Sequence, residues 1–583
     1  MDAFHSGIPN HGQGISNYHR EQPDAVGDTE SMDSDRQNIY LANDNPHQIV
    51  TFAPKERFRL GYFDVICLVL NRMIGTGIFE SPQRVIRGTR STGVSLLLWF
   101  GGVIYCLCGA HVYIEYGLNI PRYTIDGVEQ SVPRSGGDLN YLQYVYPWPA
   151  LRRNTVLLSA CIFGAGFIAF GNMASNCISF ATRLLLAADI ESPSNGTVRG
   201  IAIGIAILAC FIHAFSRRGG IWLNNVLAVI KVLMLLLIIV TAIIMVVVPK
   251  DSQVHGEDGV AQQFFELSLG GIGSSNVGKR IFNAFLAVSS VGNIIVMTYT
   301  AARVKQEIAK EGILPAAKFF AQNTDMSLGR VLRWLQRKGW LAPILRYRWL
   351  SPEEHSEKTP VGAFVLHLIA CFVLIFATWG LSAGGTYYLV SNLNSYVING
   401  IFGVLLGMGI LILRFRGPPA PDAGDASHAS HPAPRKTWGE TTGKRFNPIV
   451  SVTCAVIYII GNLWPVVASW VKPEADFTHK YKWWIMPTIC WAVICLGAAW
   501  FLCFMAIAFN IGRKQHKVYV VEKKPEFESA YGGDGPVSHE DAKAGGLVMV
   551  HETVYLSWVG RETLRARQPH GEIDGDEFDD RTA

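Results

Sequence analysis

Residues 74–77, Ile-Gly-Thr-Gly, interrupt an apolar stretch that extends from Gly61 to Ile86. Glycine costs a helix about 1 kcal/mol relative to alanine, so two glycines around a small polar residue weaken the helix here. In hydrocarbon, an opened turn leaves backbone N–H and C=O groups unpaired unless it lines a cavity. The N–H groups of the following half-helix can then bind an anion such as the carboxylate of an amino acid. The alternative is that Gly75 and Gly77 only let another helix approach closely.

Three charged side chains also lie within apolar stretches, where each needs a partner or a water-filled pocket. Lys231 comes about ten residues after the start of its stretch, which places it roughly 15 Å along a helix and near the middle of a bilayer. The alternative is a lysine that reaches the interface at a misplaced span boundary. We expect Arg72 to form an ion pair with Glu115 or to reach water, and Glu115 can equally pair with Arg122.

These residues belong to a chain that is built for a membrane. It has 583 residues, 49% of them hydrophobic and only 17% charged. About ten apolar stretches are long enough to cross a bilayer. They lie near residues 61–86, 93–118, 151–187, 198–216, 221–248, 280–302, 360–381, 385–413, 448–471 and 482–510. The sequence therefore predicts an all-α, polytopic membrane helix bundle over residues 58–512.

Polar segments flank and divide this bundle. Residues 1–57 lack hydrophobic periodicity and predict a disordered tail, residues 513–583 form a second polar tail, and the Pro-, Ala- and Ser-rich loop 417–447 is also predicted to be disordered. Basic residues concentrate in the loops on the side of the N-terminus, which places both termini in the cytoplasm. Residues 328–349 are basic with interleaved Trp and Leu, which is typical of a helix lying on the anionic inner leaflet.

Other functional classes find no support in the sequence. The net charge of +5 is modest and spread over loops, so we expect no nucleic-acid partner. The eleven cysteines include no C-x-x-C pair, so we expect no metal site. No Ser-His-Asp order or phosphate-binding loop is present, which predicts a protein that is not an enzyme and needs no cofactor.

The stretch NRMIGTGIFESP, residues 71–82, resembles the first-helix motif of the amino acid–polyamine–organocation superfamily. Within this superfamily, the chain resembles the L-type amino acid transporters and the fungal high-affinity methionine permeases. Two further stretches carry this resemblance, TIDGVEQSVPRSGGDLNYLQYVYP and AARVKQEIAKEGILP. The resemblance implies that Ile74, Gly75, Thr76 and Gly77 bind the substrate carboxylate. It also implies that Lys231 replaces a sodium ion in bracing the break, with Asn293 of the eighth helix as its partner and Ser289 or Ser290 as near alternatives.

The resemblance has one large gap. The family has twelve spans, built as two inverted repeats of five helices plus two more, with the substrate between the broken first and sixth helices. Here the polar residues 249–280 connect the fifth span to a stretch that resembles the eighth, so the sixth and seventh spans are missing. The chain is then a shortened gene or splice product, a relative that does not transport, or a protein completed by a partner subunit of unknown identity.

The expected function is secondary-active transport of neutral L-amino acids, methionine-like in side chain, by alternating access in an incomplete inverted-repeat fold. The expected partners are the small-molecule amino acid and the lipid bilayer, with the plasma membrane as the location. The alternative is a transport-dead relative that acts as a membrane scaffold or nutrient sensor.

Overall fold

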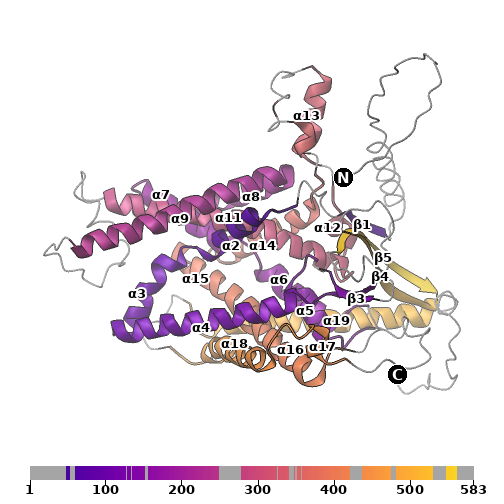
Figure 1. Cartoon of the computed structure of the whole chain (residues 1–583). Coiled ribbons are helices and arrows are strands. Elements are labelled where there is room, and N and C mark those ends of the chain that lie inside the picture. The colour runs from indigo at the N-terminus through magenta and orange to yellow at the C-terminus, as the bar shows by residue number, and fades with distance from the viewer. Residues whose placement is uncertain are drawn as a thin grey trace, which may run out of the picture. The chain divides into compact units, whose positions relative to one another are not determined.

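A computed structural model describes most of the chain (Figure 1). It covers residues 48–52, 59–125, 128–132, 134–151, 155–247, 277–324, 326–339, 347, 351–355, 357–419, 436–473, 481–529 and 547–560. The connecting segment predicted to lack two spans lies largely outside the described residues.

Long apolar helices dominate the described part of the chain, and eight segments are long and apolar enough to cross a membrane. These are α4 (Thr92–Gly117), α6 (Leu158–Phe170) with α7 (Ala174–Ala187), α8 (Asn195–Phe215), α9 (Arg217–Val247), α11 (Val277–Lys310), α15 (Ala383–Asn394) with the π-helical turn η4 (Ser395–Ile401) and α16 (Phe402–Arg416), α18 (Pro448–Ala468), and α19 (Ile485–Gln515). A shorter apolar helix is α14 (Val361–Ala377), and the first predicted span is split into α2 (Tyr62–Met73) and α3 (Gly77–Thr89). The predicted polytopic helix bundle is confirmed.

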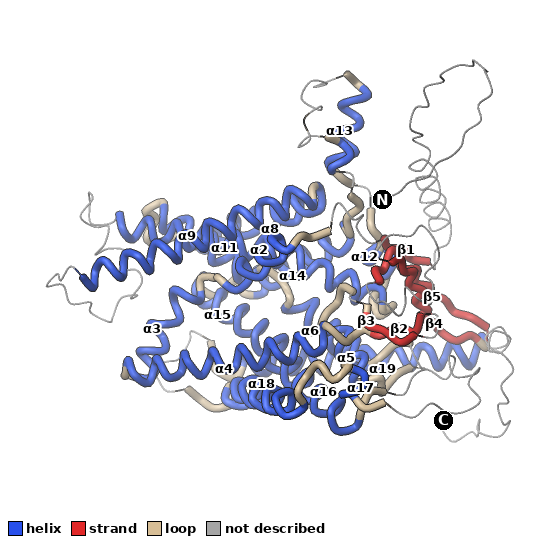
Figure 2. The backbone as a smooth tube through the Cα atoms, viewed as in Figure 1, coloured by secondary structure: helices blue, strands red, loops and turns tan. Residues whose placement is uncertain are grey.

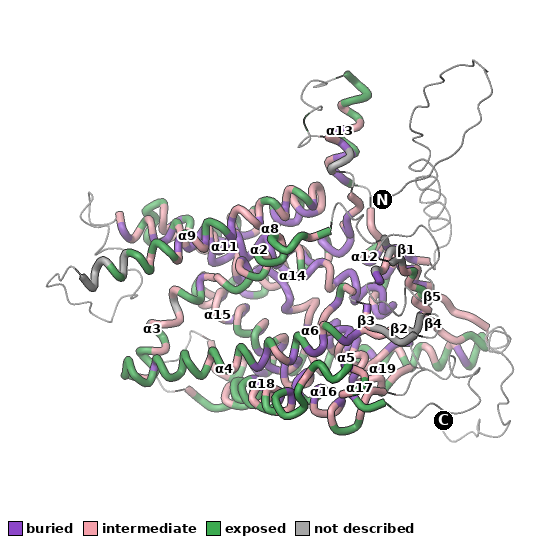
Figure 3. The backbone as a smooth tube through the Cα atoms, viewed as in Figure 1, coloured by how far each residue is buried: buried purple, intermediate pink, exposed green. Residues whose placement is uncertain are grey.

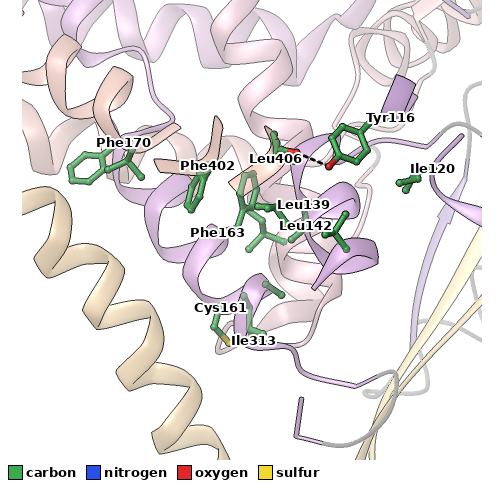
Figure 4. Close-up of a cluster of buried hydrophobic side chains, with 14 of the residues drawn as sticks. Tyr116, Ile120, Leu139, Leu142, Cys161, Phe163, Phe170, Ile313, Phe402 and Leu406 are labelled. Atoms are coloured by element: carbon green, nitrogen blue, oxygen red, sulfur yellow. Dashed lines mark hydrogen bonds between the residues drawn. The ribbon is translucent and has the colours of Figure 1, made fainter. Parts of the chain in front are cut away.

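The spans gather around two buried apolar cores. One core lies between α7, α8, α11 and α14, and α2 and α9 pack against the same group (Figures 1 and 2). The other joins α4, α6, α16, α18 and α19, with the short helix α5 (Asp138–Val145). In this second core Phe163 lies 5.1 Å from Phe402 between ring centroids, and the Tyr116 hydroxyl donates to the carbonyl of Leu406 at 2.7 Å (Figure 4).

The outward faces of the spans carry apolar side chains. Leu97, Phe100 and Leu107 of α4 are exposed, as are Leu236 and Ile239 of α9 (Figure 3). Burying these faces in hydrocarbon removes them from water, which is the arrangement that an integral membrane protein requires.

The first and last described segments of the chain form a small sheet that the sequence did not predict. Strand β1 (Gln48–Phe52) pairs antiparallel with β5 (Leu547–Gly560), with Val50 opposite Thr553, and β5 also pairs with β4 (Lys517–Ser529). A separate hairpin consists of β2 (Arg122–Ile125) and β3 (Val128–Ser131). The prediction of a disordered tail over residues 1–57 is therefore wrong for Gln48–Phe52, because β5 supplies the backbone partners that this strand needs.

Three short helices complete the loops. Helix α12 (Ala317–Ala321) and the basic helix α13 (Leu328–Arg337) follow α11, and the 3-10 turn η3 (Pro352–His355) packs beside α13. Helix α17 (Trp438–Thr441) falls in the loop predicted to be disordered, which is wrong there because the indole of Trp438 is buried in the core. Residues 420–435 of that loop lie outside the described residues.

Candidate functional site

The predicted break in the first span is present. Helix α2 ends at Met73, Ile74 has extended backbone (φ −85°, ψ 95°), and α3 begins at Gly77. Thr76 precedes α3 without a side-chain capping bond and is only 2% exposed. The two half-helices therefore present opposite ends at the break: the carbonyl end of α2 carries partial negative charge and the N–H end of α3 partial positive charge.

Lys231 of α9 closes the carbonyl end. Its Nζ donates to the carbonyl of Asn71 at 2.9 Å and to that of Ile74 at 2.7 Å. The Ser289 hydroxyl of α11 makes a longer contact of 3.5 Å to the carbonyl of Ile74. A cation at this end offsets the dipole of α2 and supplies donors to carbonyls that the helix no longer satisfies.

Asn293 and Asn71 fill the space around the break. A Cβ on Gly75 would lie 2.7 Å from Nδ2 of Asn293, so a larger residue there would displace the Asn293 side chain. The Asn71 side chain is fully buried and donates to both the carbonyl and the side chain of Asn224, at 3.0 and 2.9 Å. Asn71 and Asn224 were not predicted, although an asparagine in an apolar stretch four residues before Gly75 is a signal that the sequence contains.

Tyr387 of α15 is a further residue at the break that the sequence did not reveal. Its hydroxyl lies 2.8 Å from Oγ1 of Thr76. The contact spans 311 residues of sequence, so only the fold brings the two side chains together. The positive end of α3 remains accessible nearby, because Gly77 and Ile78 are exposed.

The predicted pairing of Arg72 with Glu115 is wrong. Glu115 is fully buried and accepts hydrogen bonds from Arg414 at 2.6 Å, from the Trp438 indole at 2.7 Å and from Ser451 at 2.5 Å. These three donors, from the side of α16 and α18, satisfy the hydrogen-bonding needs of the carboxylate. The Arg72 side chain, by contrast, is exposed. The alternative partner Arg122 instead lies 3.5 Å from the carbonyl of Thr441.

The structure thus brings seven of the predicted residues to one place: Ile74, Gly75, Thr76, Gly77, Lys231, Ser289 and Asn293. Its chemistry is that of backbone donors and acceptors organised by one buried cation. Among the described residues no group of three or more His, Cys, Asp or Glu side chains is arranged to hold a metal ion.

Comparison with known sequences matches the amino acid permease family over residues 60–248 and 242–520. The chain belongs to the amino acid permease family. It is therefore an integral membrane protein of the transporter class rather than an enzyme, within the superfamily that the motif at the break indicated. The two matched segments meet at residues 242–248, at the end of α9, where the resemblance leads us to expect that two spans are missing.

Individual relatives agree with this assignment. The high-affinity methionine permease of Saccharomyces cerevisiae (strain ATCC 204508 / S288c) is 22% identical over 543 residues, 78% of this chain and 80% of the relative. The b(0,+)-type amino acid transporter 1 of Mus musculus is 24% identical over 183 residues, 30% of this chain and 32% of its own. The large neutral amino acids transporter small subunit 2 of Homo sapiens is 29% identical over 87 residues, 15% of this chain and 14% of its own. The last two matches span a third or less of each relative.

Proposed function

We propose that this permease moves neutral L-amino acids with methionine-like side chains by alternating access. The substrate carboxylate binds the N–H groups at the start of α3, with Gly77 admitting it closely and Thr76 adding its hydroxyl. Lys231, with Ser289 beside it, holds the carbonyl end of α2, and Asn293 packs against Gly75. The similarity to a methionine permease over most of both chains supports the substrate class.

The proposal rests on the different roles of the two helix ends at the break. The two carbonyls at the end of α2 are already bonded by Lys231, so they do not compete for the substrate. The donors at the start of α3 face the other way and have a positive dipole end, which favours a carboxylate. A buried cation next to an anion site also lowers the cost of bringing negative charge into the membrane.

The alternative is a transport-dead membrane scaffold or nutrient sensor. The resemblance favours it, because it implies that the two spans forming the opposite wall of the site are missing from this chain. The two functions differ in whether the break must remain accessible.

Uptake of labelled L-methionine in cells lacking their own permeases tests the proposal. We expect Gly77→Trp to abolish uptake, because the indole would occupy the carboxylate position. Gly88→Trp is the matched control, since a Cβ at Gly88 in the same helix meets nothing within 4 Å. Uptake that survives Gly77→Trp, or that the unaltered chain lacks while it reaches the membrane, would refute the transport proposal.

A further inference from the structure

A second buried lysine lies farther along α11 and has no part in the carboxylate site. Lys305 is about 18 Å from Asn293 along the helix, at 1.5 Å per residue. Its side chain is 0% exposed. Its Nζ lies 3.0 Å from Nδ1 of His367 in α14 and 3.1 Å from the main-chain carbonyl oxygen of Gly171.

The described side chains around this pair carry no negative charge that would balance an ammonium. The titratable side chains that face Lys305 and His367 are Cys210 and His213 of α8 and Cys371 of α14, with Cys177 of α7 next to Cys371. On α11 itself, Arg303 faces His213. Among the described residues no carboxylate faces Lys305. A buried charge without a partner of opposite sign is costly, so Lys305 can exist at this site in both its charged and its neutral form.

Both protonation states of the pair can be hydrogen-bonded. With Lys305 charged, its N–H groups donate to Gly171 and to Nδ1 of His367, and the histidine carries its proton on Nε2. With Lys305 neutral, the other tautomer of His367 donates from Nδ1 to the amine. Nε2 of His367 is buried without a hydrogen-bond partner among the described residues. No contact at this atom therefore favours one tautomer over the other.

The protonation state of Lys305 also affects the break between α6 and α7, here called the joint at Gly171. Helix α6 ends at Phe170 and α7 begins at Ala174, so the span is interrupted between them. The carbonyl of Phe170 accepts from Asn394 at 2.7 Å, and the carbonyl of Gly171 accepts from Lys305. Carbonyl groups freed inside a membrane need donors, so loss of the proton from Lys305 weakens the support of this joint.

We propose that Lys305 and His367 form a proton-binding site whose occupancy is coupled to substrate movement. The inference rests on the proposed transport function. One proton binds from water on one side of the membrane and leaves on the other, and only N–H bonds form and break. The joint at Gly171 links the proton to the arrangement of α6 and α7, which pack on α19 and α11 respectively.

The test uses the purified full chain in sealed proteoliposomes that contain a pH-sensitive dye. We expect external L-methionine to acidify the interior of vesicles with the unaltered chain. Lys305→Gln keeps donors for Gly171 and His367 but cannot bind the proton, so acidification should fall at least about 10-fold while exchange of labelled for unlabelled methionine persists. Lys279→Met is the control, because Lys279 lies in the same helix and makes an exposed ion pair with Glu191.

A second variant, His367→Asn, keeps an acceptor for Lys305 without a second tautomer and should also lose methionine-driven acidification. Methionine exchange without acidification in the unaltered chain would overturn the proton site, as would full acidification with Lys305→Gln. Absence of any methionine exchange in the unaltered chain would instead overturn the transport proposal itself, and the coupling with it.

Discussion

Lys231 stabilises the break in the first span. Its two hydrogen bonds, to the carbonyls of Asn71 and Ile74, come from a charged donor, and such bonds are worth about 1.5–3 kcal/mol each. Without them two carbonyls at the end of α2 would be left in the membrane interior. The residue thus stabilises the conformation in which the start of α3 is exposed.

Replacing Lys231 tests that role. We expect Lys231→Met to lower methionine uptake at least about 10-fold, because the carbonyl end of α2 loses its donors. Uptake and the amount of protein in the membrane are measured together, with Lys279→Met as the control for removing a lysine. Wild-type uptake by Lys231→Met would show that the break needs no brace.

Gly292 of α11 sets the space available to that lysine. A Cβ there would overlap Oδ1 of Asn71 and would lie 2.8 Å from Cε of Lys231. We expect Gly292→Ala to destabilise the protein by about 1–3 kcal/mol through overpacking and to reduce uptake. Thermal unfolding in detergent measures the first effect, and Gly204→Ala is the control because a Cβ at Gly204 meets nothing within 4 Å. A Gly292→Ala protein as stable as that control would contradict the packing argument.

At the scale of elements, the terminal sheet is attached to the helices by a buried ion network. Arg134 pairs with Glu307 at 2.6 Å and with Glu552 at 2.9 Å, and Lys310 pairs with both carboxylates at 2.9 Å. Two positive and two negative side chains balance one another. Removal of one member would leave an uncompensated buried charge, which typically costs about 3–5 kcal/mol.

The network makes attachment of the sheet dependent on pH. Burial alone would raise the pKa of Glu552, but Lys310 and Arg134 outweigh it and hold the pKa below its ordinary value of 4.5. The stabilisation is therefore fully present above pH 4.5 and is lost as the pH falls through the lower folded value.

Glu552→Gln should reduce this dependence, with Glu307 still in the network, and should lower the thermal midpoint at pH 7. Thermal unfolding of the full chain between about pH 3 and pH 7 measures both effects. Glu526→Gln is the control, since the Glu526 side chain is 67% exposed. An unchanged midpoint at pH 7 for Glu552→Gln would mean that the sheet is not held by the network.

The sequence predicted local features better than distant pairings. Apolar length located the spans, and two glycines located the break, because both signals lie within one segment. Tyr387 at Thr76 and Arg414 at Glu115 could not be predicted in this way, since they depend on which helices become neighbours. Strand β1 was missed for the same reason, since its only partner strand in the described chain is β5, about 500 residues away.

At the scale of the whole molecule, the pairing of β1 with β5 requires both ends of the described chain to lie on one side of the membrane. From the distribution of basic loops we propose that this shared side is the cytoplasm. We expect tags at either terminus to resist protease added outside intact cells and to be cleaved once the cells are permeabilised. Cleavage of one tag in intact cells would contradict the shared side.

The central claim is that the protein binds an amino acid through its carboxylate, and one binding measurement tests this claim directly. We expect L-methionine to bind the purified full chain, and methioninol, which lacks the carboxylate, to bind at least about 10-fold more weakly, a difference of about 1.4 kcal/mol. Gly77→Trp should remove methionine binding, whereas Gly88→Trp should not. Equal binding of methionine and methioninol, or methionine binding that survives Gly77→Trp, would contradict the claim that the broken first span grips the amino acid's carboxylate.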